Sequence, residues 1–340
     1  MIDEMAGRRD FSVVIPFFQR RAGILTDAVT SALSQQDVPT PLVIVVDDES
    51  PVDPAVELAD LLRRFPDDLV VLRQDNQGPG AARNTGIRHA RTVSRYIALL
   101  DSDDTWLPRH LSTAATALQA GAEFYFCDIS SRQSGARTKF EGVGFPPTRP
   151  DESRGDTIDE YPGDWVRLIL TSCPINTSTV VFNAEACPFE FRTDLRVACE
   201  DYYFFLQVAA SRKRIAFSTT PQVKLGLGVN IYAGVKWGSA QMLEQLHDQV
   251  RYIKDVMTTI DTSRTYHREC AAELRTYRLS FWESAPRALR GRDRSRAASA
   301  MGRMLATDPA ILLSLPRAAV RLGSLWLAHK FGRSEPEAVD

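Results

Sequence analysis

Three carboxylates follow an apolar run that is typical of a buried strand. After Ile97-Ala-Leu-Leu100 the chain carries Asp101, Asp103 and Asp104. Such a cluster is costly unless a cation neutralises it, and aspartates at the carboxyl end of a strand can supply the hard oxygen ligands that Mg²⁺ or Mn²⁺ takes beside phosphate. An acidic turn that caps the next helix would have the same composition. The cluster alone therefore predicts either a metal site or a helix cap.

A second acidic pair is expected to lie near this cluster. Asp47 and Asp48 end another apolar run, and Pro16 lies at the end of the first such run along the chain. The carboxyl ends of parallel strands meet at one edge of a sheet, which is also where α/β proteins usually bind their ligands. We therefore expect Pro16, Asp48 and Asp101 to open onto one shared edge.

Apolar periodicity predicts the elements that must position these residues. Continuous apolar runs indicate strands that are covered on both faces, and they alternate with stretches of helical spacing. The predicted strands are 11–16, 42–46, 69–72 and 96–100, and the predicted helices are 23–36, 54–65 and 80–90. This order predicts an α/β fold with a mostly parallel sheet flanked by helices.

The second part of the chain is less regular. Its predicted elements are a helix to about 120, a strand at 123–127, a long loop at 130–164, a strand at 177–182, a helix at 202–212 and short strands at 215–217 and 222–225. From 237 onward there is no strand pattern and arginine is frequent. We therefore expect a boundary near Gly234 and a helical, basic C-terminal extension over 235–340.

Composition argues against several classes of protein. The 340 residues carry 41 basic and 43 acidic side chains, so the net charge of −2 creates no overall field that would attract nucleic acid. Five scattered cysteines without a C-x-x-C pair are typical of a reducing compartment and argue against zinc. The N-terminus lacks a signal-peptide pattern, and no run of about 18 apolar residues is present. We expect a cytoplasmic protein that spans no membrane.

Five segments follow one another in this order: Val13-Val-Ile-Pro16-Phe-Phe18-Gln19, Val43-Ile-Val-Val-Asp47-Asp48-Glu49-Ser50, Asn76-Gln-Gly78-Pro-Gly80-Ala-Ala-Arg83-Asn84-Thr-Gly86, the D-x-D motif Leu100-Asp101-Ser-Asp103-Asp104, and Cys199-Glu200-Asp201. Together they resemble the family 2 glycosyltransferases, inverting enzymes of the Rossmann-like GT-A fold that use nucleotide-diphosphate sugars. The resemblance covers 11–234. It implies a GT-A domain with a nucleotide-sugar-binding half, 11–110, and an acceptor half, 111–234.

The resemblance also implies which residues hold the donor. Phe18 would stack on a uracil-like base, Asp48 rather than Asp47 would accept a hydrogen bond from the ring N–H, and Arg83 would pair with the diphosphate. Ordinary packing of Phe18 and a surface position for Arg83 are the alternatives. The implied donor contacts are Pro16, Phe18, Gln19, Asp48, Gly80, Arg83, Asp101 and Ser102.

The catalytic roles follow from the same resemblance. Asp103 would coordinate Mn²⁺ or Mg²⁺, with Asp101 and Asp104 as the other candidate ligands, and the metal would stabilise charge on the departing nucleoside diphosphate. Asp201 is the predicted general base for the acceptor hydroxyl, with Glu200 in reserve, in a single displacement that inverts the sugar. The alternative for Asp201 is a helix cap.

Departures from the family pattern bear on the donor and the product. Gln19 stands where such proteins often have asparagine, and 226–232 lacks the basic residue that some relatives direct at the diphosphate. The Q-x-x-R-W segment of processive synthases is absent. We expect transfer of one sugar, with a UDP-sugar as donor, to a hydroxyl of a glycan or lipid-linked glycan in cell-surface or exopolysaccharide synthesis.

Two other functions stay open at this point. A phosphoacceptor receiver module would also have an acidic strand end like that at 45–49, although a receiver begins with that strand and here a strand and a helix precede it. A non-catalytic glycan-binding relative would keep the fold, but the presence of Asp101, Asp103 and Asp201 together argues against lost turnover. Hydrolysis of a nucleotide sugar with Mn²⁺ would discriminate among the three functions.

The C-terminal extension is strongly basic. Between 287 and 333 ten Lys and Arg residues stand against two Asp residues, and an apolar stripe at 311–330 is mixed with spaced cations. A helix lying on an anionic lipid surface has this pattern, which predicts peripheral membrane contact through 287–333. A helix packed on the catalytic domain, with a solvated basic face, is the alternative.

Overall fold

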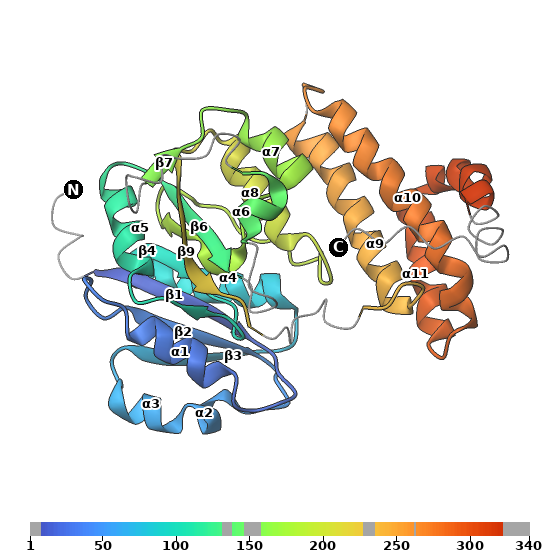
Figure 1. Cartoon of the computed structure of the whole chain (residues 1–340). Helices are drawn as coiled ribbons and strands as arrows, with labels where there is room; N and C mark the ends of the chain where they lie inside the picture. Colours follow the sequence, from blue (N-terminus) through green and yellow to red (C-terminus); the bar gives the residue numbers. More distant parts are fainter. Residues whose placement is uncertain (1–7, 131–137, 146–157, 227–234, 262, 322–340) are drawn as a thin grey trace. The chain divides into compact units, whose positions relative to one another are not determined.

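The computed structural model describes residues 8–130, 138–145, 158–226, 235–261 and 263–321 (Figure 1). The chain forms two compact units. The sheet unit contains 1–196 and 200–233, and the helical unit contains 197–199 and 234–340. The helical unit therefore includes three residues from a stretch that lies, along the sequence, inside the sheet unit.

The described part of the sheet unit is built on a nine-stranded sheet with the order β3-β2-β1-β4-β8-β6-β9-β5, and β7 pairs with β9. Pairing is parallel from β3 to β4 and between β6 and β9, and antiparallel elsewhere. The strands are β1 Arg9–Phe17, β2 Leu42–Asp48, β3 Leu69–Gln74, β4 Ser94–Leu99, β5 Thr105–Trp106, β6 Phe124–Ser130, β7 Ile158–Glu160, β8 Val181–Asn183 and β9 Ile215–Lys224.

Helices cover both faces of the parallel part of the sheet, which explains why its strands are continuous apolar runs. Val13 of β1 packs in a core cluster with Leu25 of α1 and Leu111 of α5, whereas the neighbouring Val14 faces Gly86 of α4 on the other side. The helices are α1 Leu25–Leu33, α2 Pro54–Glu57, α3 Ala59–Arg64, α4 Pro79–Val93, α5 His110–Gln119, α6 Lys139–Val143, α7 Trp165–Ser172, the 3₁₀ turn η2 Thr177–Thr179 and α8 Glu200–Ala210 (Figure 1).

The predicted α/β fold, with a mostly parallel sheet and C-terminal helices, is confirmed, but two predicted elements differ in detail. The single helix predicted at 54–65 is divided at Leu58, whose backbone angles are not helical, into α2 and α3. The strand predicted at 177–182 begins as the turn η2. This turn replaces the start of the strand for a local reason: the side chain of Asn176 accepts a hydrogen bond from the Ser178 amide and caps a helical turn.

The prediction of a structureless loop at 130–164 was wrong in its described parts. Thr138 and Glu141 form a capping box that starts α6, and β7 pairs with β9. The sequence pattern also missed α7, which Asp164 caps, and it divided β9 into two short strands around Pro221. These elements are short, so their periodicity is too weak to be recognised without the neighbours that pack on them.

The regular elements in the described residues of the helical unit are all helices, as the sequence predicts for the C-terminal part of the chain. They are α9 Ala240–Asp255, the π-helical turn η3 Val256–Ile260, α10 His267–Arg290, α11 Arg294–Thr307 and η4 Pro309–Ser314. The buried carboxylate of Asp308 joins them, since it accepts from Arg278 at 2.6 and 2.7 Å and lies 3.5 Å from Lys254 Nζ. No helix in the described part of the chain is long and apolar enough to cross a membrane.

The close approach of α4 to the sheet requires glycine at position 86. A Cβ atom added there would overlap the side chain of Val14 and contact Val46. We expect Gly86→Ala to lower the free energy of unfolding by about 1–3 kcal/mol, the usual cost of overpacking. Gly142→Ala in α6 is the matched control because an added Cβ meets nothing within 4 Å. Equal urea midpoints for the two variants would contradict this account.

Candidate functional site

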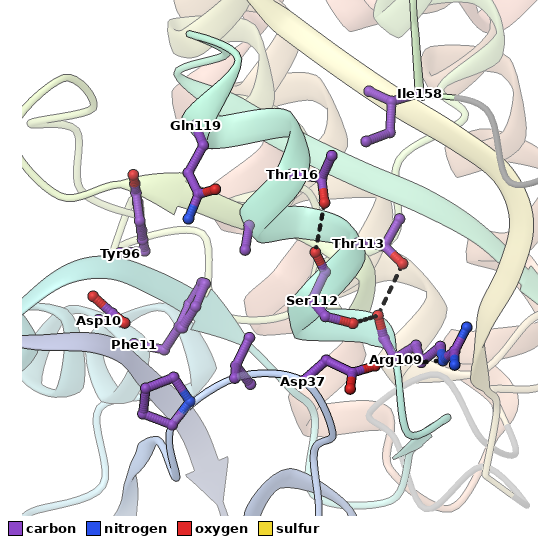
Figure 2. Close-up of a pocket in the computed structure, with 13 residues that line it drawn as sticks. Asp10, Phe11, Asp37, Tyr96, Arg109, Ser112, Thr113, Thr116, Gln119 and Ile158 are labelled. Atoms are coloured by element: carbon purple, nitrogen blue, oxygen red, sulfur yellow. Dashed lines mark hydrogen bonds and ion pairs between the residues drawn. The ribbon is translucent and has the colours of Figure 1, made fainter.

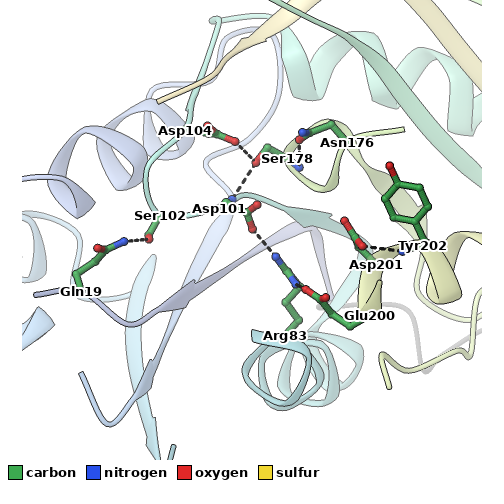
Figure 3. A network of polar contacts seen from close by, with 10 residues as sticks. All are labelled: Gln19, Arg83, Asp101, Ser102, Asp104, Asn176, Ser178, Glu200, Asp201 and Tyr202. Atoms are coloured by element: carbon green, nitrogen blue, oxygen red, sulfur yellow. Dashed lines mark hydrogen bonds and ion pairs between the residues drawn. The ribbon is translucent and has the colours of Figure 1, made fainter. Parts of the chain in front are cut away.

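Arg83 occupies the centre of the polar network at the carboxyl edge of the parallel strands (Figure 3). It lies in the second turn of α4 and is only 5% exposed. Its guanidinium donates to Asp101 at 2.7 Å and to Glu200 at 3.0 Å, and its Cζ lies 5.3 Å from the ring centre of Phe191. Arg83 thus joins the D-x-D motif to the proposed catalytic pair, and the alternative of a surface arginine is wrong.

Burial and charge oppose each other at this arginine. Burial alone would lower the pKa of Arg83, but the carboxylates of Asp101 and Glu200 outweigh it and raise the pKa above its ordinary value. Burial also raises the pKa of Glu200 and of Asp201, while Arg83 opposes both shifts. The edge therefore holds several carboxylates that are stabilised mainly by one cation.

The N-terminus of α4 is fixed by Asp48. Its carboxylate accepts from the amides of Gln77 at 2.9 Å and Gly78 at 2.8 Å, and from the side chain of Gln74 at 2.8 Å. A carboxylate before a helix is favourable because the free amides there carry partial positive charge. Asp48 therefore holds the helix that carries Arg83, a structural role that the sequence did not reveal.

The other residues of the glycine-containing turn hold a distant segment against α4. A Cβ atom added to Gly80 would lie 2.9 Å from the carbonyl oxygen of Arg192 and 3.4 Å from Cγ of Glu200. The side chain of Asn84 donates to the carbonyl of Phe191 at 2.8 Å and accepts from its amide at 2.7 Å. Gly80 thus permits close packing of this segment.

The D-x-D motif is held by residues that lie far away in sequence. Ser178 accepts from the amide of Asp101 at 3.0 Å and donates to Asp104 at 2.6 Å, while the Gly226 amide donates to Asp104 at 2.8 Å. Burial, and then the charge of Asp101, raise the pKa of Asp104 to about 7. An added Cβ at Gly226 would overlap the backbone of Asp103. Asp104 consequently anchors the turn, and Gly226 must remain glycine.

The first two strand ends reach the same network. The side chain of Gln19 donates to Ser102 at 3.1 Å (Figure 3). The backbone amide of Gln19 donates to Ser50 at 2.9 Å. The amide of Ser50 in turn donates to Asp47 at 2.8 Å. Contacts therefore connect the carboxyl ends of β1, β2 and β4, as parallel pairing requires. Near them Pro16 is partly exposed, and the ring of Phe18 is 40% exposed.

The proposed catalytic pair occupies the first turn of α8. Glu200 is 7% exposed and paired with Arg83, whereas Asp201 is half-buried. The carboxylate of Asp201 accepts from the amide of Tyr202 at 2.8 Å. Asp201 is the second residue of the helix rather than the residue that precedes it. The two neighbouring carboxylates thus differ in exposure and in partner.

The carboxylates at this edge have the charge that a divalent ion requires, but a bound phosphate would have to supply the remaining oxygen ligands. Within the described residues no three His, Cys, Asp or Glu side chains lie close enough to hold a metal. The D-x-D motif nevertheless offers hard carboxylate oxygens, and neighbouring carboxylates help to raise the pKa of Asp104 and Glu200. Mg²⁺ is commonly held by one or two carboxylates plus substrate phosphates, so the residues present fit such an ion.

Sequence reasoning missed Ser178, Gly226 and the role of Asn84. Ser178 lies in a segment predicted as a strand, which gives no sign of a contact with the D-x-D motif, and Gly226 lies in an irregular stretch just after β9. Asn84 lies beside Arg83 in one of the five segments that carry the family resemblance. That position could have indicated that Asn84 has a role in the site. The network thus contains more supporting residues than the motifs indicate.

A pocket of about 470 Å³ lies at the opposite end of the parallel strands (Figure 2). It is lined by the first residues of β1 and β4, including Phe11 and Tyr96, and by polar side chains of α5, including Ser112 and Gln119. Its lining contains none of the predicted site residues. The network around Arg83 therefore remains the candidate active site.

Comparisons with known proteins show a family and a fold that this chain is similar to. A family model described as glycosyl transferase family 2 matches residues 12–165. The succinoglycan biosynthesis protein ExoW of Rhizobium meliloti (strain 1021) is 32% identical over 245 residues, which cover 69% of this chain and 74% of ExoW.

Solved structures are similar at the level of the fold. S. aureus TarS has a TM-score of 0.55 at 16% identity, and the match covers 90% of this chain but only 55% of TarS. A mannosyltransferase from Pyrobaculum calidifontis, solved with GDP-Man and Mn²⁺, has a TM-score of 0.53 at 20% identity. The match covers 94% of this chain and 81% of the mannosyltransferase. The structure of TarS residues 1–349 in complex with UDP-GlcNAc has a TM-score of 0.51 at 16% identity. The match covers 91% of this chain and 92% of that TarS chain. The GT-A fold is thereby confirmed.

The buried cation predicts a large effect of its removal. Arg83→Met leaves Asp101 and Glu200 without their shared partner, so we expect a loss of about 3–5 kcal/mol in the free energy of unfolding at pH 8. The loss should shrink as the pH falls, because protonation removes the uncompensated charge. Arg88→Met is the matched control on α4, since its exposed pair with Glu190 is worth about 1 kcal/mol at most. Urea unfolding measures both, and similar losses would contradict the assignment.

Proposed function

Because the chain belongs to glycosyltransferase family 2, we propose that it transfers one sugar from a nucleotide-diphosphate sugar to an acceptor hydroxyl, with inversion. The observation that carries the proposal is the contact of buried Arg83 with both Asp101 and Glu200. It joins the motif expected at the diphosphate to the pair expected at the acceptor. Membership of the family removes the receiver-module alternative.

The proposed pathway is the synthesis of a cell-surface or secreted polysaccharide. Its support is the similarity to ExoW, a succinoglycan biosynthesis protein, and to GgaA of Bacillus subtilis, a minor teichoic acid biosynthesis protein of which this chain covers 25%. The acceptor would be a glycan or a lipid-linked glycan. We assign donor binding to 11–110 and acceptor binding to 111–234.

A UDP-sugar is the proposed donor. TarS has been solved with UDP-GlcNAc, and the exposed ring of Phe18 offers a surface on which a base can stack. Asp48 Oδ2 accepts from the Gly78 amide, and a carboxylate oxygen has a second lone pair for a ring N–H. Pro16, Gln19, Gly80 and Ser102 would complete the donor site through backbone shape and polar contacts.

We propose a divalent ion, Mn²⁺ or Mg²⁺, with Asp103 as its direct ligand. Asp101 contacts Arg83, and Asp104 contacts Ser178 and Gly226, so these two carboxylates also act as supports of the motif. The chemistry that such an ion supplies is stabilisation of charge on the leaving diphosphate. Arg83 contributes a second positive charge at the same edge.

Asp201 is the proposed general base, because it is more exposed than Glu200 and is not paired directly with Arg83 in the described contacts. Burial raises the pKa of Asp201, which makes the carboxylate a better proton acceptor near neutral pH. Only the ionised form can accept the proton. Turnover should therefore rise with pH through the apparent pKa of the Glu200–Asp201 pair and be lost at more acidic pH.

The test is a thermal-shift screen of UDP-glucose, UDP-galactose, UDP-GlcNAc and GDP-mannose, each with Mn²⁺. A true donor should raise Tm with its concentration because it binds only the folded state. Asp201→Asn should keep that shift while transfer, and hydrolysis of the donor, fall by about 10²-fold or more. Glu185→Gln, at an exposed surface pair with Arg8, is the control variant.

Each result in this test has a defined meaning. If no nucleotide sugar shifts Tm, the donor assignment is wrong. Donor binding without turnover in the wild type would favour a non-catalytic relative, and normal turnover of Asp201→Asn would remove the proposed base.

We further propose that 309–321 contacts an anionic membrane surface. Four large apolar side chains of this stretch are exposed, namely Leu312 (50%), Leu313 (82%), Leu315 (40%) and Val320 (70%). Arg317 and Arg321 lie among them and are exposed as well. Apolar side chains beside arginines suit the boundary between acyl chains and anionic headgroups. The rest of the predicted contact region, 322–333, lies outside the described residues.

The membrane proposal predicts that the exposed leucines carry much of the affinity. Leu312→Ser together with Leu313→Ser should lower pelleting with phosphatidylglycerol vesicles by at least about tenfold, since each buried leucine contributes about 1.5 kcal/mol or more. Val56→Ser, at a 76% exposed valine of α2, should have no effect. Equal pelleting of the wild type and the double variant would contradict the proposal.

A further inference from the structure

The residues directly before the proposed base belong to the helical unit. The segment Val197–Cys199 groups with that unit, although Glu200 and Asp201 follow it without a break. Within the unit, the amide of Val197 donates to Oδ2 of Asp248 on α9 at 2.9 Å. The first turn of α8 is therefore covalently continuous with a segment that the C-terminal helices hold.

Asp248 is itself fixed by buried neighbours. It is 6% exposed, and its Oδ1 lies 3.4 Å from Nδ1 of His247, which is equally buried. Nε2 of His247 lies 3.0 Å from the hydroxyl of Thr307, the last residue of α11, and Lys254 donates to the carbonyl of Thr307 at 2.6 Å. Polar contacts thus run from the end of α11 through α9 to the amide of Val197.

The last residue of the held segment has an uncommon backbone conformation. Cys199 has φ +67°, in the left-handed region that a residue with a Cβ atom rarely adopts, and it is 8% exposed. Such conformations persist only where the surroundings fix them, and they are frequent at functional sites. Cys199 leads directly into Glu200, so its angles set the direction in which α8 begins.

We propose that Asp248 is a positioning residue for catalysis. Its carboxylate holds Val197, Cys199 carries the chain through the left-handed conformation, and the first turn of α8 then presents Asp201 to the acceptor hydroxyl. The inference rests on the proposed function, because it assigns the base to Asp201. It gives the helical unit a part in the reaction that its sequence does not indicate.

Hydrogen exchange tests the positioning itself, independently of activity. Asp248→Ala in the full chain should speed amide exchange of a peptide covering 197–203 by about tenfold, because it removes a buried hydrogen bond. Glu244→Ala is the matched control, one turn earlier on α9, since its ion pairs run to Arg296 and Arg303. Unchanged exchange at 197–203 in Asp248→Ala would overturn the proposal.

Kinetics test the consequence for the reaction, with hydrolysis of UDP-glucose, UDP-galactose and UDP-GlcNAc in Mn²⁺ as the assay. Asp248→Ala should lower kcat by about tenfold with an unchanged donor KM, and Asp248→Asn, which keeps an acceptor oxygen, should recover most of the loss. Wild-type kcat in Asp248→Ala, or an equal loss in Glu244→Ala, would overturn the inference. If the wild type hydrolyses none of these donors, the proposed function fails, and exchange alone then decides whether Asp248 fixes the segment.

Discussion

The need to neutralise one buried guanidinium determines how the site is arranged. Arg83 is enclosed by protein, so it must have charged partners, and these come from the end of the parallel sheet and from the start of α8. The same contacts give the carboxylates of Asp101 and Glu200 a shared positive partner. One requirement of folding thereby brings together the groups that would bind the diphosphate and accept the proton.

The helix that carries this arginine is held by contacts at several points along its length. Asp48 accepts from the two backbone amides just before it, Gly86 allows its approach to β1 and β2, and Asn84 binds both backbone groups of Phe191. A buried charge can be placed accurately only on an element that cannot shift. The proposed chemistry of the site therefore depends on ordinary packing and hydrogen bonds along α4.

The sequence predicts most of the fold and the regions of the site, but few of the contacts within it. Long apolar runs identify β1, β2 and β4, because burial on both faces requires them. The role of Asp48 at α4 was not predictable, since a carboxylate that binds backbone amides looks the same as one that binds a nucleotide. Ser178 and Gly226 could not be found because their partners are distant in sequence. Short elements such as α6 and β7 depend on tertiary neighbours.

The change in strand direction between β4 and β8 has a consequence for diversification. Only three residue pairs align these two strands, with Tyr96 opposite Asn183 at one end. On the β4 side of this pairing lies the parallel block β3-β2-β1-β4, and on the β8 side lie the parallel pair β6–β9, short antiparallel pairs and irregular connections. An insertion or an exchanged loop on the β8 side would therefore leave the pairing of β1, β2, β3 and β4 unchanged. Variation in one half of the sheet is thus separated from the strand ends that carry the polar network of the other half.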